Sequence, residues 1–239
     1  MALTRLLIKT TKSRIEKIIS PKTLREAMEI IDGRRIAGEV REELKDKVSK
    51  LKERGIAPGL AAIIVGEDPA SRSYLKGISK GCGKVGISME TFELSADAAQ
   101  EELEKKIEEL NRDEKFHGII LQLPLPKHLN ALKAESAISP QKDVDGTNPI
   151  NTGKLLLGED TFLPSTPYGV QQLLVRSGNS PEGKNVVICG RSNIVGKPLM
   201  GILVQKREGA NATVTMCHTR TKDLPSVTQK ADILIAAMG

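Results

Sequence analysis

Tyr74 lies in the stretch SRSYLKGISK, residues 71–80, and is one of only two tyrosines in the chain. Two lysines stand close by, so the segment is a candidate active-site helix if they share the face of the phenol. On a helix, however, the residues that lie over Tyr74 are those three and four positions on, and of these Ile78 carries the large side chain. Lys76 and Lys80 therefore point elsewhere, and the pattern predicts an isoleucine as the neighbour of this tyrosine.

A glycine-bearing turn is expected in NVVICGRSNIVGKP, residues 185–198, between a buried strand and a helix. Such a turn lets backbone N–H groups and the N-terminus of the helix meet a pyrophosphate. The pattern departs from G-x-G-x-x-G, because Ser192 stands at the second glycine position and Val195 at the third, with Gly196 one residue later. The motif alone is therefore equally consistent with a plain strand–helix turn.

The end of the following strand favours one dinucleotide over another. It reads CHTRT, residues 217–221, and lacks the carboxylate that holds the ribose hydroxyls in NAD-binding proteins. Arg191 and Arg220 could instead meet a 2′-phosphate. If a dinucleotide binds, NADP is therefore favoured over NAD, and the alternative is that both arginines are solvated surface residues.

Two further segments carry polar groups in an apolar context. In GIILQLPLP, residues 118–126, Gln122 has the only side chain able to form a hydrogen bond. We expect this amide to be buried in a strand, where it either reads the polar edge of a ligand or bonds to neighbouring backbone. KDVDG, residues 142–146, offers Asp143 and Asp145, and turn-forming chemistry is expected to explain one of them.

The elements that must position these residues alternate between strand and helix from residue 30 onward. Strands are expected at 60–66, 87–94, 118–125, 184–190, 212–218 and 231–239. Helices are expected at 39–55, from Asp68-Pro69 to Gly83 or Gly86, and at 99–112, 131–138, 167–177 and 195–206, with Thr166 as the N-cap before Pro167. Residues 139–152 read as a long polar loop at the carboxyl end of a strand–helix unit, where open α/β sheets place ligands. The alternation predicts parallel sheets in two units joined near residues 150–166.

Composition excludes several classes of function. The formal net charge is +6, but residues 1–26 hold seven basic and two acidic residues, so the remaining chain is nearly neutral. With three Phe, two Tyr and no Trp there is little surface on which bases could stack, so no nucleic-acid partner is expected. No apolar run approaches a membrane span, and no membrane partner is expected. The basic leader is similar to an organelle transit peptide; the alternative is a dispensable extension or a start codon assigned too early.

The remaining reactive residue types show no pattern of their own. The three cysteines are odd in number and far apart, which indicates free thiols in a reducing compartment. No Ser/His/Asp arrangement suggests a catalytic triad, and the histidines lack the spacing of metal ligands, so no metal site is expected. The residues concerned are Cys82, Cys189, Cys217, His117, His128 and His218.

Five motifs, in order, together resemble one family. They are S-x-x-Y at Ser71–Tyr74, GIILQLPLP, KDVDGTNPIN, P-S-T-P-x-G at 164–169, and GRSNIVGKP. From about Ile30 to Gly239 the chain is similar to the bifunctional methylenetetrahydrofolate dehydrogenase/methenyltetrahydrofolate cyclohydrolases. The resemblance implies a homodimer of two-domain α/β subunits, in which a parallel-sheet catalytic domain and an NADP-binding Rossmann domain flank a folate cleft. The expected division is a basic extension at 1–28, a folate-binding catalytic domain at 29–150, a linker at 151–166 and a Rossmann domain at 167–239.

The resemblance also implies roles for individual residues. The catalytic set is Tyr74, which would pack against the pterin, Asp145, which would bond its amino-pyrimidine edge, and Gln122, which would tune the family's catalytic lysine. The substrate-binding set adds Leu123 and Pro124. The NADP site would be lined by Gly190, Arg191, Ser192, Ile194, Val195, Gly196, His218, Thr219 and Arg220.

The sequence departs from the family pattern at two places. The catalytic lysine of the family stands four residues after the tyrosine, where this chain has Ile78. Members also continue beyond the strand that ends at Gly239, with further Rossmann strands and a closing helix. We therefore expect either a fragment, with a C-terminally incomplete Rossmann domain, or a compromised protein.

The function expected from the resemblance is NADP-dependent oxidation of 5,10-methylenetetrahydrofolate to 5,10-methenyltetrahydrofolate, in one-carbon metabolism and purine biosynthesis. Because of Ile78, hydrolysis of the product to 10-formyltetrahydrofolate is expected to be weak or absent. The alternatives are a homologue that binds folate or nucleotide without catalysis, and another NADP-linked enzyme resembling shikimate dehydrogenase. A cytoplasmic location is expected, or the mitochondrial matrix if the leader is a transit peptide.

Overall fold

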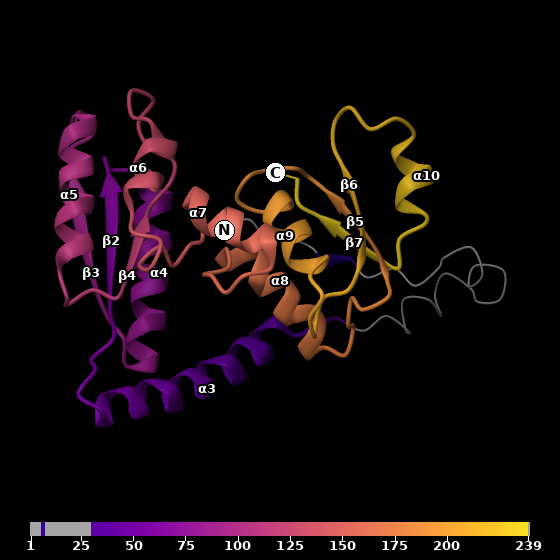
Figure 1. Ribbon diagram of the computed structural model, residues 1–239, viewed down its shortest axis with the longest axis horizontal. Coiled ribbons are helices and arrows are strands. Elements are labelled where there is room, and N and C mark those ends of the chain that lie inside the picture. The colour runs from indigo at the N-terminus through magenta and orange to yellow at the C-terminus, as the bar shows by residue number, and fades with distance from the viewer. Residues whose placement is uncertain (1–5, 8–29, 239) are drawn as a thin grey trace. The chain divides into compact units, whose positions relative to one another are not determined.

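The computed structural model of the protein describes residues 6–7 and 30–238 (Figure 1). The chain forms two compact units. The first unit spans Arg34–Lys154, and the second unit comprises the described residues from Leu155 onward together with those before Arg34. Each unit is built on a sheet of its own, so the expected two-part α/β fold is confirmed. Residues 1–28, to which the transit-peptide expectation applies, lie outside the described residues except for residues 6–7.

The first unit has a parallel sheet in which β2 (Gly59–Val65) lies between β3 (Ser88–Leu94) and β4 (Gly118–Leu121). Alternate residues of β2 face two separate clusters. Ile63 packs with residues of α5 (Gln100–Arg112), and Ile64 packs with Leu75 of α4 (Pro69–Val85). The two helices therefore cover opposite faces of the sheet, as Figure 1 shows. A strand buried on both faces needs an apolar residue at nearly every position, which explains the continuous run LAAIIV.

Helix α4 begins and ends where the sequence signals predict. The Asp68 carboxylate accepts a hydrogen bond from the Ser71 N–H at 2.7 Å, Pro69 occupies the first turn, and Gly86 ends the helix in the left-handed conformation. The remaining helices of this unit are α3 (Gly33–Glu53) and α6 (Ala131–Ala137), followed by α7 (Pro149–Leu157), which crosses the sequence boundary to the second unit.

The second unit has a sheet of order β1-β7-β5-β6. The strands β5 (Asn185–Cys189), β6 (Thr213–Cys217) and β7 (Ile233–Ala236) are parallel, and β1 (Leu6–Leu7) pairs antiparallel with β7. The parallel pairing predicted for this half of the chain is therefore confirmed. Cys189 lies opposite Cys217 in the register of the two strands, so β5 and β6 end side by side at the same edge of the sheet.

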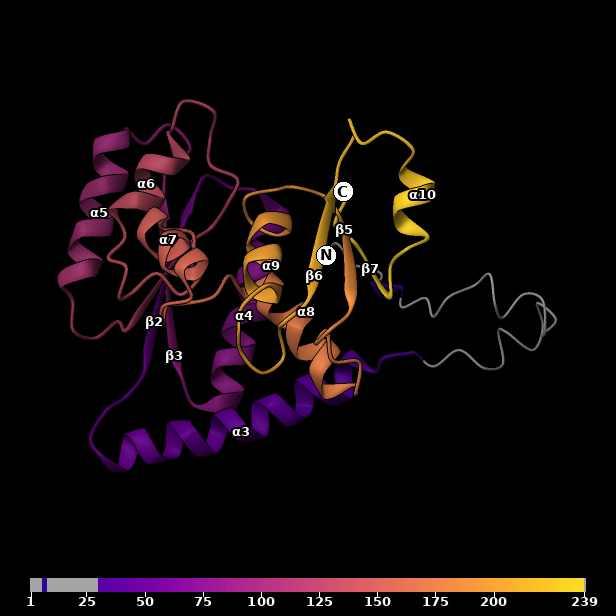
Figure 2. The same cartoon turned by 45° about the vertical axis from the view of Figure 1, so that its right-hand side comes forward.

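Helices also lie on both faces of this sheet (Figure 2). Val186 and Ile188 of β5 pack with α8 (Ser165–Arg176) and α9 (Gly196–Leu203). Val187 and Cys189 point the other way and pack near α10 (Leu224–Thr228). Helices α8 and α9 thus hold β5 from one side and leave its carboxyl end open to a turn.

Several predicted boundaries are wrong. Residues 149–152, predicted as loop, are the first turn of α7. Helix α8 begins at Ser165 after Pro164, with no side-chain cap, so Thr166 is not its N-cap. Pro167 then lies inside the first turn, where a missing N–H costs little. Strand β4 ends at Leu121 and not at residue 125, because the prolines that follow cannot donate to a ladder. Helix α10 was not predicted.

Two other expectations concern the cysteines and membrane-spanning helices. All three cysteines are free, with Cys189 and Cys217 buried and Cys82 half-buried, as expected from their number and spacing. Within residues 6–7 and 30–238, no helix has both the length and the apolar character needed to cross a membrane.

Candidate functional site

The face of α4 that carries Tyr74 has the arrangement predicted from helical spacing. The Tyr74 side chain is 56% exposed, and Ile78 is half-buried against the cluster of Ala62, Ile64, Leu75 and Ile120. Lys76 and Lys80 are both exposed. Position 78 is thus an apolar neighbour of the tyrosine, and neither lysine takes its place.

Gln122 directly follows the last residue of β4 and is half-buried, so the prediction of a buried strand residue is wrong. Its backbone N–H donates to the Ile63 carbonyl at 2.9 Å, which extends the sheet by one bond. The side-chain Nε2 donates to the Leu123 carbonyl at 2.6 Å. Of the two roles expected for this amide, the structure contains the bond to neighbouring backbone. Leu123 is half-buried and Pro124 exposed.

Asp143 and Asp145 have different environments, although they stand two residues apart. Asp143 is 1% exposed and accepts hydrogen bonds from the N–H groups of Thr147 and Asn148 and from Nδ2 of Asn151. It is the turn-forming residue of the pair. Asp145 is half-buried in the turn that Asp143 closes.

Tyr74 and Asp145 come together from separate elements. Partial burial, and after it the negative charge of Asp145, raise the pKa of the Tyr74 phenol above its ordinary value. A carboxylate that raises this pKa lies within electrostatic reach of the phenol. Val144, the neighbour of Asp145, packs against the cluster that contains Leu75, the neighbour of Tyr74, so the carboxylate and the exposed ring belong to adjoining segments.

A third carboxyl group near this turn was not predicted. Glu135 of α6 is half-buried, and burial raises its pKa, with smaller contributions from the charges of Asp143 and Asp145 and an opposing hydrogen bond with Thr147. Sequence reasoning also assigned no role to Asn148 and Asn151. The signal available for the two asparagines was the density of Asn and Asp in residues 139–152, but nothing in the sequence marks Glu135.

The glycine turn of the second unit is held by a close approach of backbone to backbone. A Cβ atom on Gly196 would collide with the carbonyl of Gly190, and a Cβ on Gly190, whose φ is +137°, would collide with the carbonyl of Ala237. Gly196 therefore does the work that the third glycine does in G-x-G-x-x-G. The Ser192 hydroxyl accepts from the Val195 N–H at 3.1 Å and completes the turn.

The second turn at this edge follows β6. The His218 N–H donates to Oγ1 of Thr221 at 2.9 Å, and the Arg220 N–H donates to Nδ1 of His218 at 3.1 Å. The side chains of Thr219 and Arg220 are exposed beyond it. Because β5 and β6 end in register, the residues of both turns lie at one edge of the sheet: Gly190, Arg191, Ser192, Ile194, Val195 and Gly196 after β5, and His218, Thr219 and Arg220 after β6.

This edge fits a phosphorylated dinucleotide. The turn brings the start of α9 against Gly190 with no side chain in between, which is the form of a pyrophosphate cradle. Two exposed guanidinium groups, of Arg191 and Arg220, belong to the same edge and match a phosphate monoester. Among the described residues no group of three His, Cys, Asp or Glu side chains could hold a metal ion.

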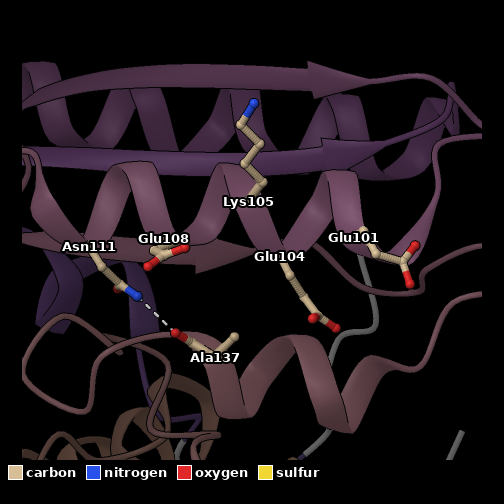
Figure 3. Close-up of a pocket in the computed structure, with 6 residues that line it drawn as sticks. All are labelled: Glu101, Glu104, Lys105, Glu108, Asn111 and Ala137. Atoms are coloured by element: carbon tan, nitrogen blue, oxygen red, sulfur yellow. Dashed lines mark hydrogen bonds between the residues drawn. The ribbon is translucent and has the colours of Figure 1, made fainter.

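A separate groove lies between α5 and α6 (Figure 3). It contains none of the predicted site residues and is lined by Glu101, Glu104, Lys105, Glu108, Asn111 and Ala137. Its three glutamates would repel anionic ligands such as folates and nucleotides. We therefore place the candidate site at the carboxyl ends of the strands.

Comparisons with known proteins match both units of the chain to one family. The tetrahydrofolate dehydrogenase/cyclohydrolase catalytic-domain family model matches residues 31–145, and the NAD(P)-binding domain of the same family matches residues 164–239. The bifunctional protein FolD of Dehalococcoides mccartyi is 53% identical over 211 residues, which cover 88% of this chain and 71% of that protein.

Solved structures of the same family are also similar to this chain. The FolD methylenetetrahydrofolate dehydrogenase/cyclohydrolase of Campylobacter jejuni has a TM-score of 0.85 and 44% identity, covering 89% of this chain and 74% of that one. The methylenetetrahydrofolate dehydrogenase-cyclohydrolase of Trypanosoma brucei, solved with NADP and an inhibitor, has a TM-score of 0.81 and 36% identity, covering 88% and 72%.

Proposed function

The chain belongs to the tetrahydrofolate dehydrogenase/cyclohydrolase family, and we propose that it oxidises 5,10-methylenetetrahydrofolate to 5,10-methenyltetrahydrofolate with NADP as its cofactor. The observation that carries the proposal is the packing of Val144 against the cluster of Leu75, which brings the segments of Asp145 and Tyr74 together in the first unit. The edge of the second unit's sheet at which β5 and β6 end would bind the cofactor. An unrelated NADP-linked dehydrogenase is excluded by the family match over both units.

The first unit would bind the folate. The exposed ring of Tyr74 offers a flat apolar surface to the pterin. The carboxylate of Asp145 accepts hydrogen bonds only, which suits the N–H groups of an amino-pyrimidine edge. Gln122, Leu123 and Pro124 follow β4 at the same end of the sheet and would line the site.

The second unit would bind NADP, which accepts the hydride when it is bound. Gly190 and Gly196 keep the turn free of side chains, so that the N-terminus of α9 meets the pyrophosphate. Arg191 and Arg220 would bind the 2′-phosphate, and Ser192, Ile194, Val195, His218 and Thr219 would line the remaining surface of the site.

Ile78 is expected to affect the two reactions of the family differently. Hydride removal from the methylene carbon leaves a cation that the adjacent nitrogens stabilise, so this step needs positioning and no proton acceptor. Addition of water and cleavage of the carbon–nitrogen bond need a group that moves protons, whose help is typically worth about 100- to 10,000-fold. Because Ile78 occupies the position at which the family has its catalytic lysine, we propose that cyclohydrolase activity is weak or absent.

The test is to assay both reactions on the purified protein. NADPH should form with saturable dependence on 5,10-methylenetetrahydrofolate, and methenyltetrahydrofolate should hydrolyse at about the spontaneous rate. Hydrolysis well above that rate would contradict the role given to Ile78. A protein that binds NADP and folate without forming NADPH would establish the alternative, a non-catalytic homologue.

Substitution of Ile78 sharpens the test. Ile78→Lys should raise the hydrolytic rate by about 100-fold or more, because it restores a proton-transferring group beside Tyr74. The matched control is Ser79→Lys, which adds the same amine to an exposed position off this face of α4. If both variants hydrolyse the substrate equally, the position of the amine is irrelevant and the argument from Ile78 is wrong.

Assembly, pathway and location are further parts of the proposal. The family resemblance supports a homodimer, which sedimentation equilibrium tests, and a supply of one-carbon units for purine biosynthesis. The bacterial relatives support a cytoplasmic location, and the comparisons offer no support for the mitochondrial alternative. The family matches at 31–145 and 164–239 support a folate-binding domain at 29–150 and a Rossmann domain at 167–239, with a linker at 151–166 and an extension at 1–28.

A further inference from the structure

We propose that Asp143, Asn148 and Asn151 are positioning residues, which form a buried clamp that holds Asp145 beside Tyr74 for folate binding. The inference rests on the proposed function, since it assigns to these three side chains the task of fixing a folate-binding carboxylate. No part of the clamp would touch the substrate.

The carboxylate of Asp143 closes the turn in which Asp145 stands. One oxygen accepts from the Thr147 N–H at 3.2 Å, and the other accepts from the Asn148 N–H at 2.9 Å and from Nδ2 of Asn151 at 2.8 Å. A buried carboxylate is stable only while such bonds are made. The two ends of the turn are therefore fixed to one side chain, and Asp145 lies between them.

The two asparagines fix the turn to its neighbours. Nδ2 of Asn148 donates to the Ile138 carbonyl at 2.9 Å just beyond α6, and its Oδ1 accepts from the Ile150 N–H at 2.8 Å in the first turn of α7. Nδ2 of Asn151 also donates to the Pro140 carbonyl at 2.9 Å. Asn148 and Asn151 are each 2% exposed. The turn thus cannot move without breaking bonds at the ends of two helices.

The other side of the turn is held by apolar contacts. Val144 packs against the cluster that contains Leu75 of α4, the helix that carries Tyr74. A Cβ atom on Gly118 would collide with the Val144 side chain, so β4 leaves space for it. The turn that carries Asp145 is therefore held on one side by the polar clamp and on the other by packing against the cluster that contains Leu75 of the Tyr74 helix.

The concentration of buried polar groups argues for function. Among the described residues five polar or charged side chains are buried, and three of them are these clamp residues. A turn alone needs no such network, since an exposed Asp or Asn can form one. Fully bonded buried networks select one arrangement over others, which is what a binding carboxylate requires.

The test is the Asn151→Leu variant, which keeps the number and branching of the side-chain heavy atoms and removes both donated bonds. We expect the KM for 5,10-methylenetetrahydrofolate to rise by about 10- to 100-fold, because a small misplacement of a positioning group has effects of this order. The kcat should stay within about threefold, since Asp145 contacts a part of the substrate that does not react. The Kd for NADP, which the second unit binds, should not change.

Asn111→Leu is the matched control. The Asn111 amide of α5 donates to the Ala137 carbonyl at 2.8 Å, as Figure 3 shows, and accepts from the Ser139 N–H at 2.8 Å, so it also secures the end of α6. It makes no bond to Asp143. Its loss should lower the melting temperature but leave the KM within about twofold. An equal rise of KM in both variants, or an unchanged KM in Asn151→Leu, would overturn the inference.

A second measurement does not depend on enzyme activity. In a Tyr168→Phe background Tyr74 is the only tyrosine and the chain has no tryptophan, so absorbance near 295 nm follows its ionisation alone. Asn151→Leu should move the pKa of Tyr74 toward its ordinary value, because Asp145 is no longer held close, and Asn111→Leu should not. An unchanged pKa of Tyr74 in Asn151→Leu overturns the inference, whereas a wild-type protein without dehydrogenase activity overturns only the proposed function. If Asn151→Leu does not fold, Asn151→Ser is judged by the same outcomes.

Discussion

The two turns for which we propose ligand binding are stabilised by different means. The Asp143–Asn148 turn of the first unit is held by hydrogen bonds to a buried carboxylate. The Gly190–Gly196 turn of the second unit is held by contact between backbone atoms that only glycine permits. The first should therefore fail when a hydrogen-bond partner is removed, and the second should fail when a methyl group is added.

The largest effect should come from Gly196→Ala. The added Cβ would collide with the carbonyl of Gly190, so the turn or the start of α9 must shift. Overpacking of this kind costs about 1–3 kcal/mol, and we expect the Kd for NADP to rise on the order of 100-fold. Isothermal titration would measure it.

Gly169→Ala is the matched control for this change. Gly169 lies in α8 of the same unit, and a Cβ there would meet no atom within 4 Å. The substitution should leave the Kd for NADP unchanged and, because alanine favours helix, raise stability by about 0.5–1 kcal/mol. If Gly196→Ala binds NADP as well as Gly169→Ala does, the backbone contact is not what builds the site.

A smaller effect is expected at the edge of the same turn. Arg220→Gln removes an exposed guanidinium that would bind the 2′-phosphate, so the Kd for NADP should rise about tenfold while the Kd for NAD stays constant. Arg207→Gln, at another exposed position of the second unit, should change neither value. A loss of affinity for both dinucleotides would show that Arg220 supports the turn and does not select the phosphate.

The two turns also differ in how far the sequence predicts them. Glycine has few structural substitutes, so the spacing of Gly190 and Gly196 predicted the second turn, even though Ser192 and Val195 depart from the usual pattern. The strands were predictable for a similar reason, because burial on both faces leaves an uninterrupted apolar run such as LAAIIV. In each case one local constraint determines the residue type.

The first turn depends on contacts between elements, and local patterns do not record them. Asp143 and Asp145 have the same side chain, and only the fold makes Asp143 a buried anchor and leaves Asp145 half-buried. Glu135 lies within electrostatic reach of Asp143 and Asp145 because α6 leads into the turn. Gln122 was expected in a strand, but prolines that cannot join a ladder end β4 before it.

The smallest effect should be on stability and concerns Glu135. The folded state raises the pKa of this carboxyl chiefly by burial, so folding is favoured while Glu135 is protonated and loses stability as the pH rises from the unfolded-state pKa through the folded-state pKa. Glu135→Gln removes the charge and keeps an acceptor for Thr147. Its melting temperature should therefore exceed that of the wild type by about 1–2 °C at pH 7.5, and the difference should vanish near pH 4.

Glu104→Gln should show the opposite sign. A hydrogen bond and ion pair with Lys133, at 2.8 Å, lower the pKa of Glu104, so the stability that this residue contributes is present at neutral pH and is lost as the pH falls through its folded-state pKa. The variant should melt slightly below the wild type at pH 7.5 and equally at low pH. Because the two glutamates belong to the same unit and receive the same substitution, a common sign in both would mean that the amide itself, and not the environment of each carboxylate, determines the change in stability.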